Sequence, residues 1–310
     1  MKTLRIGSRG SALALWQANH IRARLVEMRG IKSEIIRIHT SGDHFQAAAI
    51  SQIGTKGVFI KELEDALLAG KIDLAVHSMK DVPTEIPQGL AFPAISKRED
   101  VRDCFISHHG VTLEKLPPSS RVGSSSLRRQ AQLRMHRPDL EPVELRGNVD
   151  TRMKKVAAGA YDAIILAKAG VDRLGLTEKI TEVLSTAIML PAVGQGALGI
   201  ETRVADRETS RLVEALDDED TRSCVTAERA LLRELEGGCQ VPLGAWARLG
   251  AGGLLLEACV LSPDGKEHLR REQHGAPEDA EKIGRRLGQI LLEAGADRIL
   301  RLAGRSVGNG

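Results

Sequence analysis

The chain has 310 residues, enough for two or three domains that each build their own hydrophobic core. Its net charge is only +3 and aromatic residues make up only 2% of it, so the composition argues against a general affinity for nucleic acid or membranes and against base-stacking surfaces. The longest apolar stretch, residues 187–200, contains Pro191 and three glycines and is too short to span a bilayer.

Short β-like runs alternate with helical runs, which is typical of an α/β protein. In the first block the expected elements are a strand at 4–7, a helix from Ser11 to about Met28, a strand at 34–39, an amphipathic helix at 57–68, and a strand at 72–77 that ends in a polar turn. Polar residues at the carboxyl end of a parallel strand lie where ligands bind in open α/β sheets. The turn at 78–81 is therefore a candidate binding position.

A second block begins near Asp103, and a third differs from both. The second block is expected to contain a strand at 121–123, a helix that Pro138 ends, and strands at 142–145, 163–167 and 196–201. The third is expected to contain a helix from 215 to 237, strands over 245–274 with a turn at 263–265, a helix at 277–294, and a frayed tail at 304–310. This last part is predicted to be a small α+β domain.

The cysteines and the N-terminus indicate a reduced cytoplasm. Four cysteines are widely scattered without C-x-x-C spacing, and the nine histidines show no ligand spacing, so we expect neither a disulfide framework nor a metal site. The first residues run directly into a strand and lack the apolar region of a signal peptide.

Two strand-to-helix junctions repeat one chemistry. Residues 7–11 and residues 123–129 combine glycine, serine and arginine at the start of an expected helix. Backbone N–H groups at a helix N-terminus bind anions, and arginine adds bidentate recognition of carboxylate or phosphate. Seven arginines lie between Arg121 and Arg152, many beside Gly or Ser, which favours a polyanionic ligand over DNA. Ordinary helix capping with solvated arginines remains the alternative for either junction alone.

Asp81 follows the strand at 72–77, next to Lys80. A carboxylate among cations is expected to stay ionised and could stabilise a developing cation or move a proton. A turn aspartate that bonds its own backbone is the alternative.

Cys239 lies in the run 236–242, just after Gly237 and Gly238 and before Pro242. Two glycines end a helix and give the backbone unusual freedom, so the thiol could be presented to a cleft as an attachment point or nucleophile. The alternative is that Cys239 is an ordinary loop residue with no chemical role.

Taken together, these sequence segments resemble those of the porphobilinogen deaminase family. The matching segments are Gly7-Ser8-Arg9, residues 13–17, 56–59 and 61–63, Ala75 to Pro83, Gly123 to Arg129, Leu145 to Asn148, Leu190 to Gly196 and Glu236 to Pro242. They extend from the first strand to the third block in the family's order.

The resemblance implies an α/β fold of three domains. The first two would be lobes like those of periplasmic binding proteins, with mixed, mainly parallel sheets, and the third a small α+β domain. The expected boundaries are 1–98 with 197–214 for the first lobe, 99–196 for the second, and 215–310 for the domain that carries the cofactor.

The resemblance also implies a transferase of tetrapyrrole and haem biosynthesis. Such enzymes condense four porphobilinogen molecules head to tail with loss of ammonia, and then release hydroxymethylbilane by hydrolysis. A dipyrromethane cofactor would be attached as a thioether to Cys239, and we expect a cytoplasmic monomer with no nucleic-acid or membrane partner. Asp81 and Lys80 would be catalytic.

The remaining site residues follow from the same resemblance. Cofactor-binding residues would be Cys239, Ser11, Ser78, Lys80, Asp81, Ser124, Ser125, Ser126, Arg128, Arg129, Arg146 and Gly147. Substrate-binding residues would be Arg9, Gln17, Arg146, Arg152, Arg173, Gln195 and Phe59.

Two other classes of function compete with this interpretation. A non-catalytic binding protein could share the lobes and the anion sites but would have no use for the thiol of Cys239. A simple cysteine-nucleophile hydrolase would need a general base, and no histidine neighbours this loop in sequence.

Overall fold

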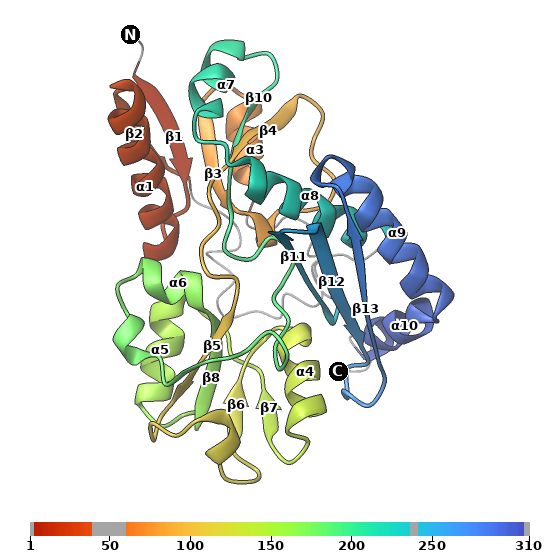
Figure 1. The fold of residues 1–310 in the computed structure, drawn as a ribbon. Coiled ribbons are helices and arrows are strands. Elements are labelled where there is room, and N and C mark those ends of the chain that lie inside the picture. Colours follow the sequence, from red (N-terminus) through yellow and green to blue (C-terminus); the bar gives the residue numbers. More distant parts are fainter. Residues whose placement is uncertain (1–2, 39–59, 236–240, 307–310) are drawn as a thin grey trace. The chain divides into compact units, whose positions relative to one another are not determined.

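The computed structural model describes residues 3–38, 60–235 and 241–306. The chain divides into two compact units (Figure 1). The first unit comprises residues 1–99 and 196–222, and the second comprises residues 100–195 and 223–310. The chain therefore leaves the first unit after Glu99, returns at Gly196, and leaves again after Arg222.

A five-stranded sheet organises the first unit. Its order is β2 (Ser33–Arg37), β1 (Leu4–Ser8), β3 (Leu74–Ser78), β10 (Leu198–Arg203) and β4 (Leu90–Ile95). β1 pairs in parallel with β2 and β3, whereas β10 is antiparallel to both of its neighbours. Four strands thus run in one direction, and the single reversed strand belongs to the returning segment of the chain.

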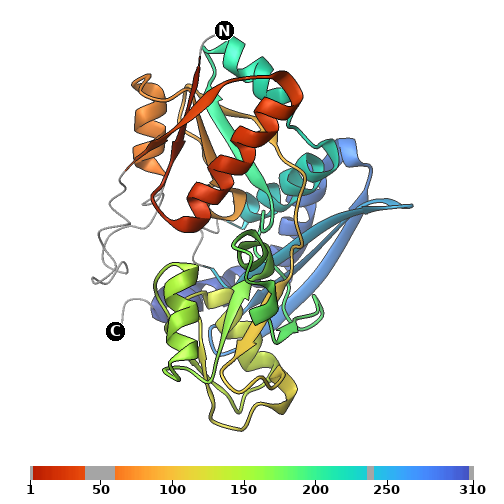
Figure 2. The ribbon, with the colours of Figure 1, turned by 90° about the vertical axis from the view of Figure 1, so that its left-hand side faces the viewer.

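Helices cover the two faces of this sheet. α1 (Ala12–Arg29) packs Ile21 and Leu25 onto the face that contains Ile6 and Val76, and α3 (Lys61–Leu68) covers the face that contains Ala75. Figure 2 shows α1 lying across the strands. α7 (Arg207–Glu214) contacts β4, β10 and α1. The helix and strand geometry brings the start of α1 and the end of β3 to one edge of the sheet.

The second unit repeats this topology in its own five-stranded sheet. The order is β7 (Glu141–Val143), β6 (Arg121–Gly123), β8 (Ala163–Ala167), β5 (Asp103–Ser107) and β9 (Glu182–Val183). β6 is parallel to β7 and β8, and β5 is antiparallel to both of its neighbours. α4 (Leu127–His136), α5 (Val149–Ala157) and α6 (Lys168–Arg173) follow three of these strands.

A smaller sheet completes the second unit. Its antiparallel strands are β11 (Leu243–Gly250), β12 (Gly253–Leu261) and β13 (His268–Gly275), and α8 (Glu219–Glu234), α9 (Ala280–Glu293) and α10 (Ala296–Ser306) accompany it. Leu190 packs with Cys259 and Leu261, and the Ala245 N–H donates to the Pro191 carbonyl at 2.9 Å. These contacts join the small domain to the residues that precede Gly196.

Most predicted elements are confirmed where the structure describes them, including the two mixed lobe sheets and the small α+β domain. Residues 39, 57–59 and 236–237 of the predicted elements lie outside the described residues. The helix expected from residue 215 is wrong at its start, because α8 begins at Glu219 and α7 precedes it. Asp218 caps α8 by accepting from the Thr221 N–H at 2.9 Å, and Asp217 accepts from the Ile95 N–H at 2.7 Å. The frayed tail expected from residue 304 is wrong through Ser306, where α10 ends.

Candidate functional site

A pocket in the first unit gathers several of the predicted site residues. It is lined by Arg9, Ser11, Leu13, Ala14, Gln17, Ile60, Leu63, Val76, His77, Ser78 and Asp81. These residues come from the β1–α1 junction, the first turns of α1, the start of α3 and the end of β3. The pocket is therefore at the carboxyl edge of the parallel strands, as the sequence predicted.

Hydrogen bonds fix the polar wall of this pocket. Ser11 caps α1 by accepting from the Ala14 N–H at 3.3 Å. The Gln17 amide, which is buried, donates to the Ser78 hydroxyl at 2.8 Å and so ties α1 to the end of β3. Arg9 lies between β1 and this cap, where its guanidinium can receive a carboxylate.

Asp81 is exposed at the pocket, whereas Lys80 is half-buried and is not part of the lining. Both belong to the short helix η2 (Met79–Asp81) that follows β3 directly. Met79 is buried, its N–H donates to the Ala197 carbonyl at 3.0 Å, and its side chain packs against Gly199 of β10. A Cβ at residue 199 would overlap the Met79 sulfur, so the glycine allows η2 to sit close to the sheet.

His77, which lines the pocket, belongs to a buried pair that the sequence did not predict. His77 Nε2 lies 3.0 Å from Glu201 Oε2, and the Glu201 side chain is fully buried. The Phe92 ring meets the His77 ring edge-on at 5.8 Å. The only sequence signal was that both residues interrupt apolar strands, since their pairing spans 124 positions.

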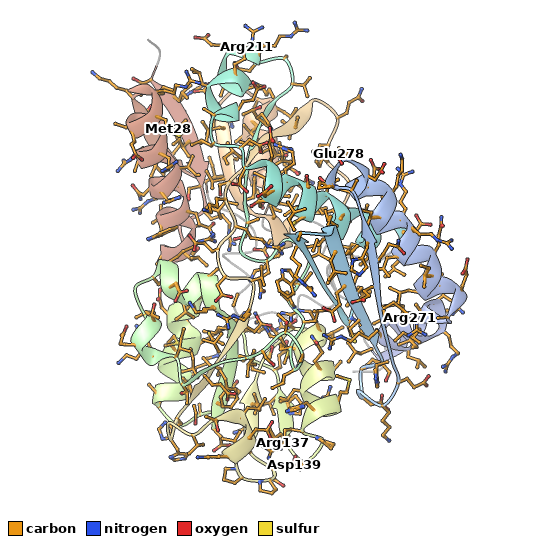
Figure 3. The ribbon with its side chains drawn as sticks, in the orientation of Figure 1. Met28, Arg137, Asp139, Arg211, Arg271 and Glu278 are labelled. Carbon is orange, nitrogen blue, oxygen red and sulfur yellow. The ribbon has the colours of Figure 1, made fainter. Side chains whose placement is uncertain are left out.

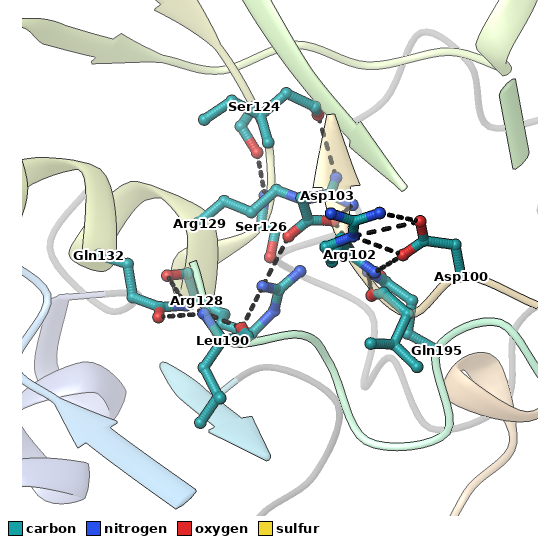
Figure 4. Close-up of polar contacts among 12 residues, drawn as sticks. Asp100, Arg102, Asp103, Ser124, Ser126, Arg128, Arg129, Gln132, Leu190 and Gln195 are labelled. Carbon is teal, nitrogen blue, oxygen red and sulfur yellow. Dashed lines mark hydrogen bonds and ion pairs between the residues drawn. The ribbon is translucent and has the colours of Figure 1, made fainter. Parts of the chain in front are cut away.

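The second unit builds a polar cluster around Asp103, the first residue of β5 (Figure 4). Arg128 Nη1 donates to Asp103 Oδ2 at 2.8 Å, and Arg129 Nη2 donates to Oδ1 at 2.8 Å. The Gln195 amide donates to Oδ1 at 2.9 Å and to the Val101 carbonyl at 2.7 Å. All four side chains are buried. Asp103 was not predicted as a site residue.

Serine residues shape the loop that leads into α4. The Ser124 hydroxyl accepts from the Ser126 N–H at 3.2 Å, and the Ser124 N–H donates to the Val143 carbonyl at 2.9 Å. Ser126 is the N-cap of α4 but makes no side-chain capping bond, and Ser125 is exposed. The first N–H groups of α4 thus lack the side-chain cap that Ser11 gives α1.

The cluster around Asp103 carries more positive than negative charge. Burial alone would raise the pKa of Asp103, but the charges of Arg128 and Arg129 outweigh burial and hold that pKa well below its ordinary value. Burial lowers the pKa of Arg128, and Asp103 offsets part of the effect; a guanidinium nonetheless stays protonated in proteins. Two cations and one carboxylate leave one net positive charge in this cluster.

The unused donors in this cluster suit an anionic group. The Nε atoms of Arg128 and Arg129 are buried and have no hydrogen-bond partner among the described residues. Orphaned N–H donors beside an uncompensated positive charge are costly unless an anion binds. The carboxylate-bearing dipyrromethane group that the resemblance implies therefore fits this donor set.

Three further predicted residues gather at the start of α5. Arg152 Nε donates to the Gly147 carbonyl at 2.7 Å, and the Lys155 ammonium donates to the Arg146 carbonyl at 3.3 Å. Gly147 has φ +115°, a conformation that favours glycine. Arg146 also pairs with the exposed Glu144 at 2.5 Å. Arg173, the last residue of α6, is buried.

The other arginines of the run 121–152 bond to the protein itself. Arg137 donates to the carbonyls of Leu113 and Leu116 and pairs with Asp139 at 2.6 Å, and Figure 3 shows Arg137 and Asp139 together at one end of the second unit. Arg134 donates to the Pro263 carbonyl at 2.8 Å, and Arg121 lies 5.6 Å from the Tyr161 ring centroid. These three arginines therefore contribute to the structure of the second unit.

Cys239 and Phe59 lie outside the described residues, so their predicted roles stay predictions. Cys104, Cys224 and Cys259 are buried, and none of them forms a disulfide within the described part of the chain. Burial raises the pKa of Cys104 to about 12 and that of Cys259 to about 11. Within the described part of the chain, no helix is long and apolar enough to cross a membrane and no group of acidic, histidine and cysteine side chains could hold a metal ion.

Solved structures similar to this chain include the VFT2 domain of Bordetella pertussis BvgS, with a TM-score of 0.41 and 15% identity over 68% of this chain and 85% of that one. A Salmonella typhimurium periplasmic binding protein with high arginine specificity gives a TM-score of 0.40 and 14% identity over 72% of this chain and 94% of that one.

Relatives found by sequence match nearly the whole chain. Residues 4–211 match the model of the porphobilinogen deaminase dipyrromethane cofactor binding domain, and residues 222–293 match the porphobilinogen deaminase C-terminal domain. Porphobilinogen deaminases of Syntrophobacter fumaroxidans and Trichlorobacter lovleyi are each 50% identical over 300 residues, which is 96% of this chain and 97% and 96% of theirs. The chain, with its Asp81 pocket and its arginine clusters, belongs to the porphobilinogen deaminase family.

Proposed function

We propose that this chain condenses four porphobilinogen molecules head to tail on a dipyrromethane primer and then releases hydroxymethylbilane by hydrolysis. The observation that carries the proposal is the exposed carboxylate of Asp81 at a pocket lined by Arg9, Ser11 and Ser78. Porphobilinogen bears two carboxylates and an aminomethyl group, so it needs anion-binding groups beside a group that can stabilise positive charge.

Each condensation forms a C–C bond and breaks a C–N bond. The aminomethyl nitrogen leaves as ammonia, and the pyrrole carbon that attacks the resulting electron-poor methylene loses its proton, so that atoms and charge balance. Positive charge develops on pyrrole nitrogen as the C–N bond breaks. Asp81 lies where its carboxylate can accept the pyrrole N–H and stabilise that charge, and it can pass the released proton onward.

The other polar groups are assigned to binding. Arg9 would bind a substrate carboxylate. Ser11 and the hydrogen bond between Gln17 and Ser78 would keep the polar wall of the pocket in place. Gln195 is proposed to act through Asp103, since its amide bonds there. Arg146, Arg152 and Arg173 remain proposed substrate ligands, and Phe59 and Lys80 keep their proposed roles.

The dipyrromethane group, when bound, would supply the free pyrrole carbon to which the first substrate unit adds, and each later unit would add to the one before it. We assign its covalent attachment to Cys239 and one of its carboxylates to Arg128 and Arg129, with Ser124 to Ser126 and Gly147 at the neighbouring junctions. The free Nε donors and the excess positive charge around Asp103 support this assignment. The proposal includes a monomer that works in the cytoplasm without nucleic acid.

The role of Asp81 can be tested by substitution in the loaded enzyme. Asp81→Asn keeps the size of the side chain and removes the charge, and Glu85→Gln is a matched control on the exposed segment that follows η2. We expect Asp81→Asn to retain the cofactor mass and to lower ammonia release from porphobilinogen by about 100-fold or more, and Glu85→Gln to leave both unchanged. Ammonia release at the wild-type rate in Asp81→Asn would refute the assignment.

A further inference from the structure

Asp103 has an environment that its position in sequence does not suggest. It opens β5 three residues after the chain enters the second unit, and its side chain is fully buried. Oδ2 accepts from Arg128, and Oδ1 accepts from both Arg129 and Gln195, at 2.8 to 2.9 Å. Both carboxylate oxygens are therefore engaged by side chains from elements far apart in sequence.

The two guanidiniums are also held by backbone oxygens. Arg128 Nη1 donates to the Leu190 carbonyl at 2.6 Å, and Arg129 Nη1 donates to the Ile165 carbonyl at 3.1 Å. These neutral acceptors fix the orientation of each guanidinium but contribute no negative charge. Among the described residues, Asp103 is the one acidic group in contact with either cation.

We propose that Asp103 is a positioning residue that serves as the internal counter-ion of Arg128 and Arg129 and keeps one charge and two Nε donors available for a cofactor carboxylate. The inference rests on the proposed function, in which these arginines bind the cofactor. Without Asp103 the two adjacent cations would repel each other in a buried site. With two acidic groups instead of one, the cluster would be neutral and would bind an anion less strongly.

If Asp103 is the counter-ion, its contribution to thermal stability should depend on whether the cofactor is bound. Asp103→Asn raises the buried charge from one to two positive charges in the protein without cofactor. With a cofactor carboxylate bound, the same substitution raises it only from zero to one. Because each further unpaired charge is costly in a buried site, the loss of thermal stability should be larger without cofactor than with it.

The experiment compares melting temperatures in two backgrounds, the holoenzyme and the Cys239→Ser protein. Asp73→Asn provides the matched control, since Asp73 is equally buried between two arginines, Arg5 and Arg203, in the first unit. We expect Asp103→Asn to lower the melting temperature more in Cys239→Ser than in the holoenzyme, and Asp73→Asn to lower it equally in both. Equal losses for Asp103→Asn in the two backgrounds would overturn the counter-ion role.

A second variant covers the case in which Asp103→Asn alone does not fold. Asp103→Asn combined with Arg129→Gln returns the cluster to a single positive charge while removing further hydrogen bonds. In the Cys239→Ser background the double variant should be more stable than Asp103→Asn alone. If it is less stable, hydrogen bonding and not charge balance governs the site, and the inference fails.

Intact mass separates this inference from the proposed function. The holoenzyme should carry an adduct of dipyrromethane mass that Cys239→Ser lacks. If the adduct is present and the two backgrounds respond equally, only the role of Asp103 is refuted. If the unmutated chain carries no adduct, the proposed function is contradicted and this inference falls with it.

Discussion

Gly199→Ala tests how the sheet places Asp81. A methyl group at residue 199 would overlap the Met79 sulfur and would lie 2.7 Å from the Phe92 ring. Met79 begins η2, which ends at Asp81, so relief of this overlap must move the Met79 side chain, the Phe92 ring or η2 itself. Overpacking a buried site costs about 1–3 kcal/mol. A shift of about 1 Å in a catalytic group can lower the rate by about 100-fold.

The assay measures kcat for ammonia release together with the melting temperature, and Gly250→Ala serves as the control. Gly250 ends β11 and has nothing within 4 Å of an added Cβ. We expect Gly199→Ala to lower the melting temperature by about 2–10 °C and kcat by at least 10-fold, with Gly250→Ala close to wild type. A Gly199→Ala enzyme indistinguishable from Gly250→Ala would refute the packing argument.

Removal of Met79 identifies the contact responsible. If the new methyl acts through the Met79 side chain, Gly199→Ala and Met79→Ala should not be additive. The double variant should be more stable than the sum of the two single losses predicts, by more than about 0.5 kcal/mol. Additive losses would show that the clash is taken up elsewhere, for example by the Phe92 ring.

Three other expectations concern buried and paired groups. Because burial raises the pKa of Cys104 to about 12 and of Cys259 to about 11, both stay neutral thiols at pH 8 and should not react with iodoacetamide until the protein unfolds; peptide mapping would reveal labelling that contradicts this. The pKa of Asp206, which burial raises, is lowered overall by its capping bonds and by Arg203. The contribution of Asp206 to the free energy of unfolding is therefore present at neutral pH and is lost as the pH falls through that lowered pKa. Asp206→Ala should cost about 1 kcal/mol at pH 7 and less at pH 3, and an equal cost at both pH values in denaturant titrations would count against this sign. His77→Ala leaves the Glu201 carboxylate buried without its partner and should cost about 3–5 kcal/mol, more than Glu201→Gln, which keeps that bond; equal losses in urea unfolding would contradict the pairing.

Features determined by short sequences could be predicted well. Ser11 caps α1 where a serine precedes an apolar periodic run, and β8 matches the predicted strand at 163–167. The polar turn after β3 was expected at the carboxyl edge of the sheet, and Ser78 and Asp81 both reach the pocket there. Local signals suffice when neighbouring residues supply the cap, the turn or the strand end.

Pairings between distant residues could not be predicted. Asp103 meets Arg128 across 25 positions and Gln195 across 92, and Glu201 meets His77 across 124. Nothing in the composition around Asp103 distinguishes it from an exposed acid, so the arginines could be assigned to a ligand but not to their counter-ion. The start of α8 was missed for the same reason, since Asp217 bonds to the backbone of β4.

The most direct test of the central claim is the intact mass of the native protein before and after porphobilinogen is added. The account predicts an adduct of dipyrromethane mass that is absent from Cys239→Ser, and stepwise gains of one condensed pyrrole unit when substrate is supplied. An unmodified native mass that does not change with porphobilinogen would contradict it.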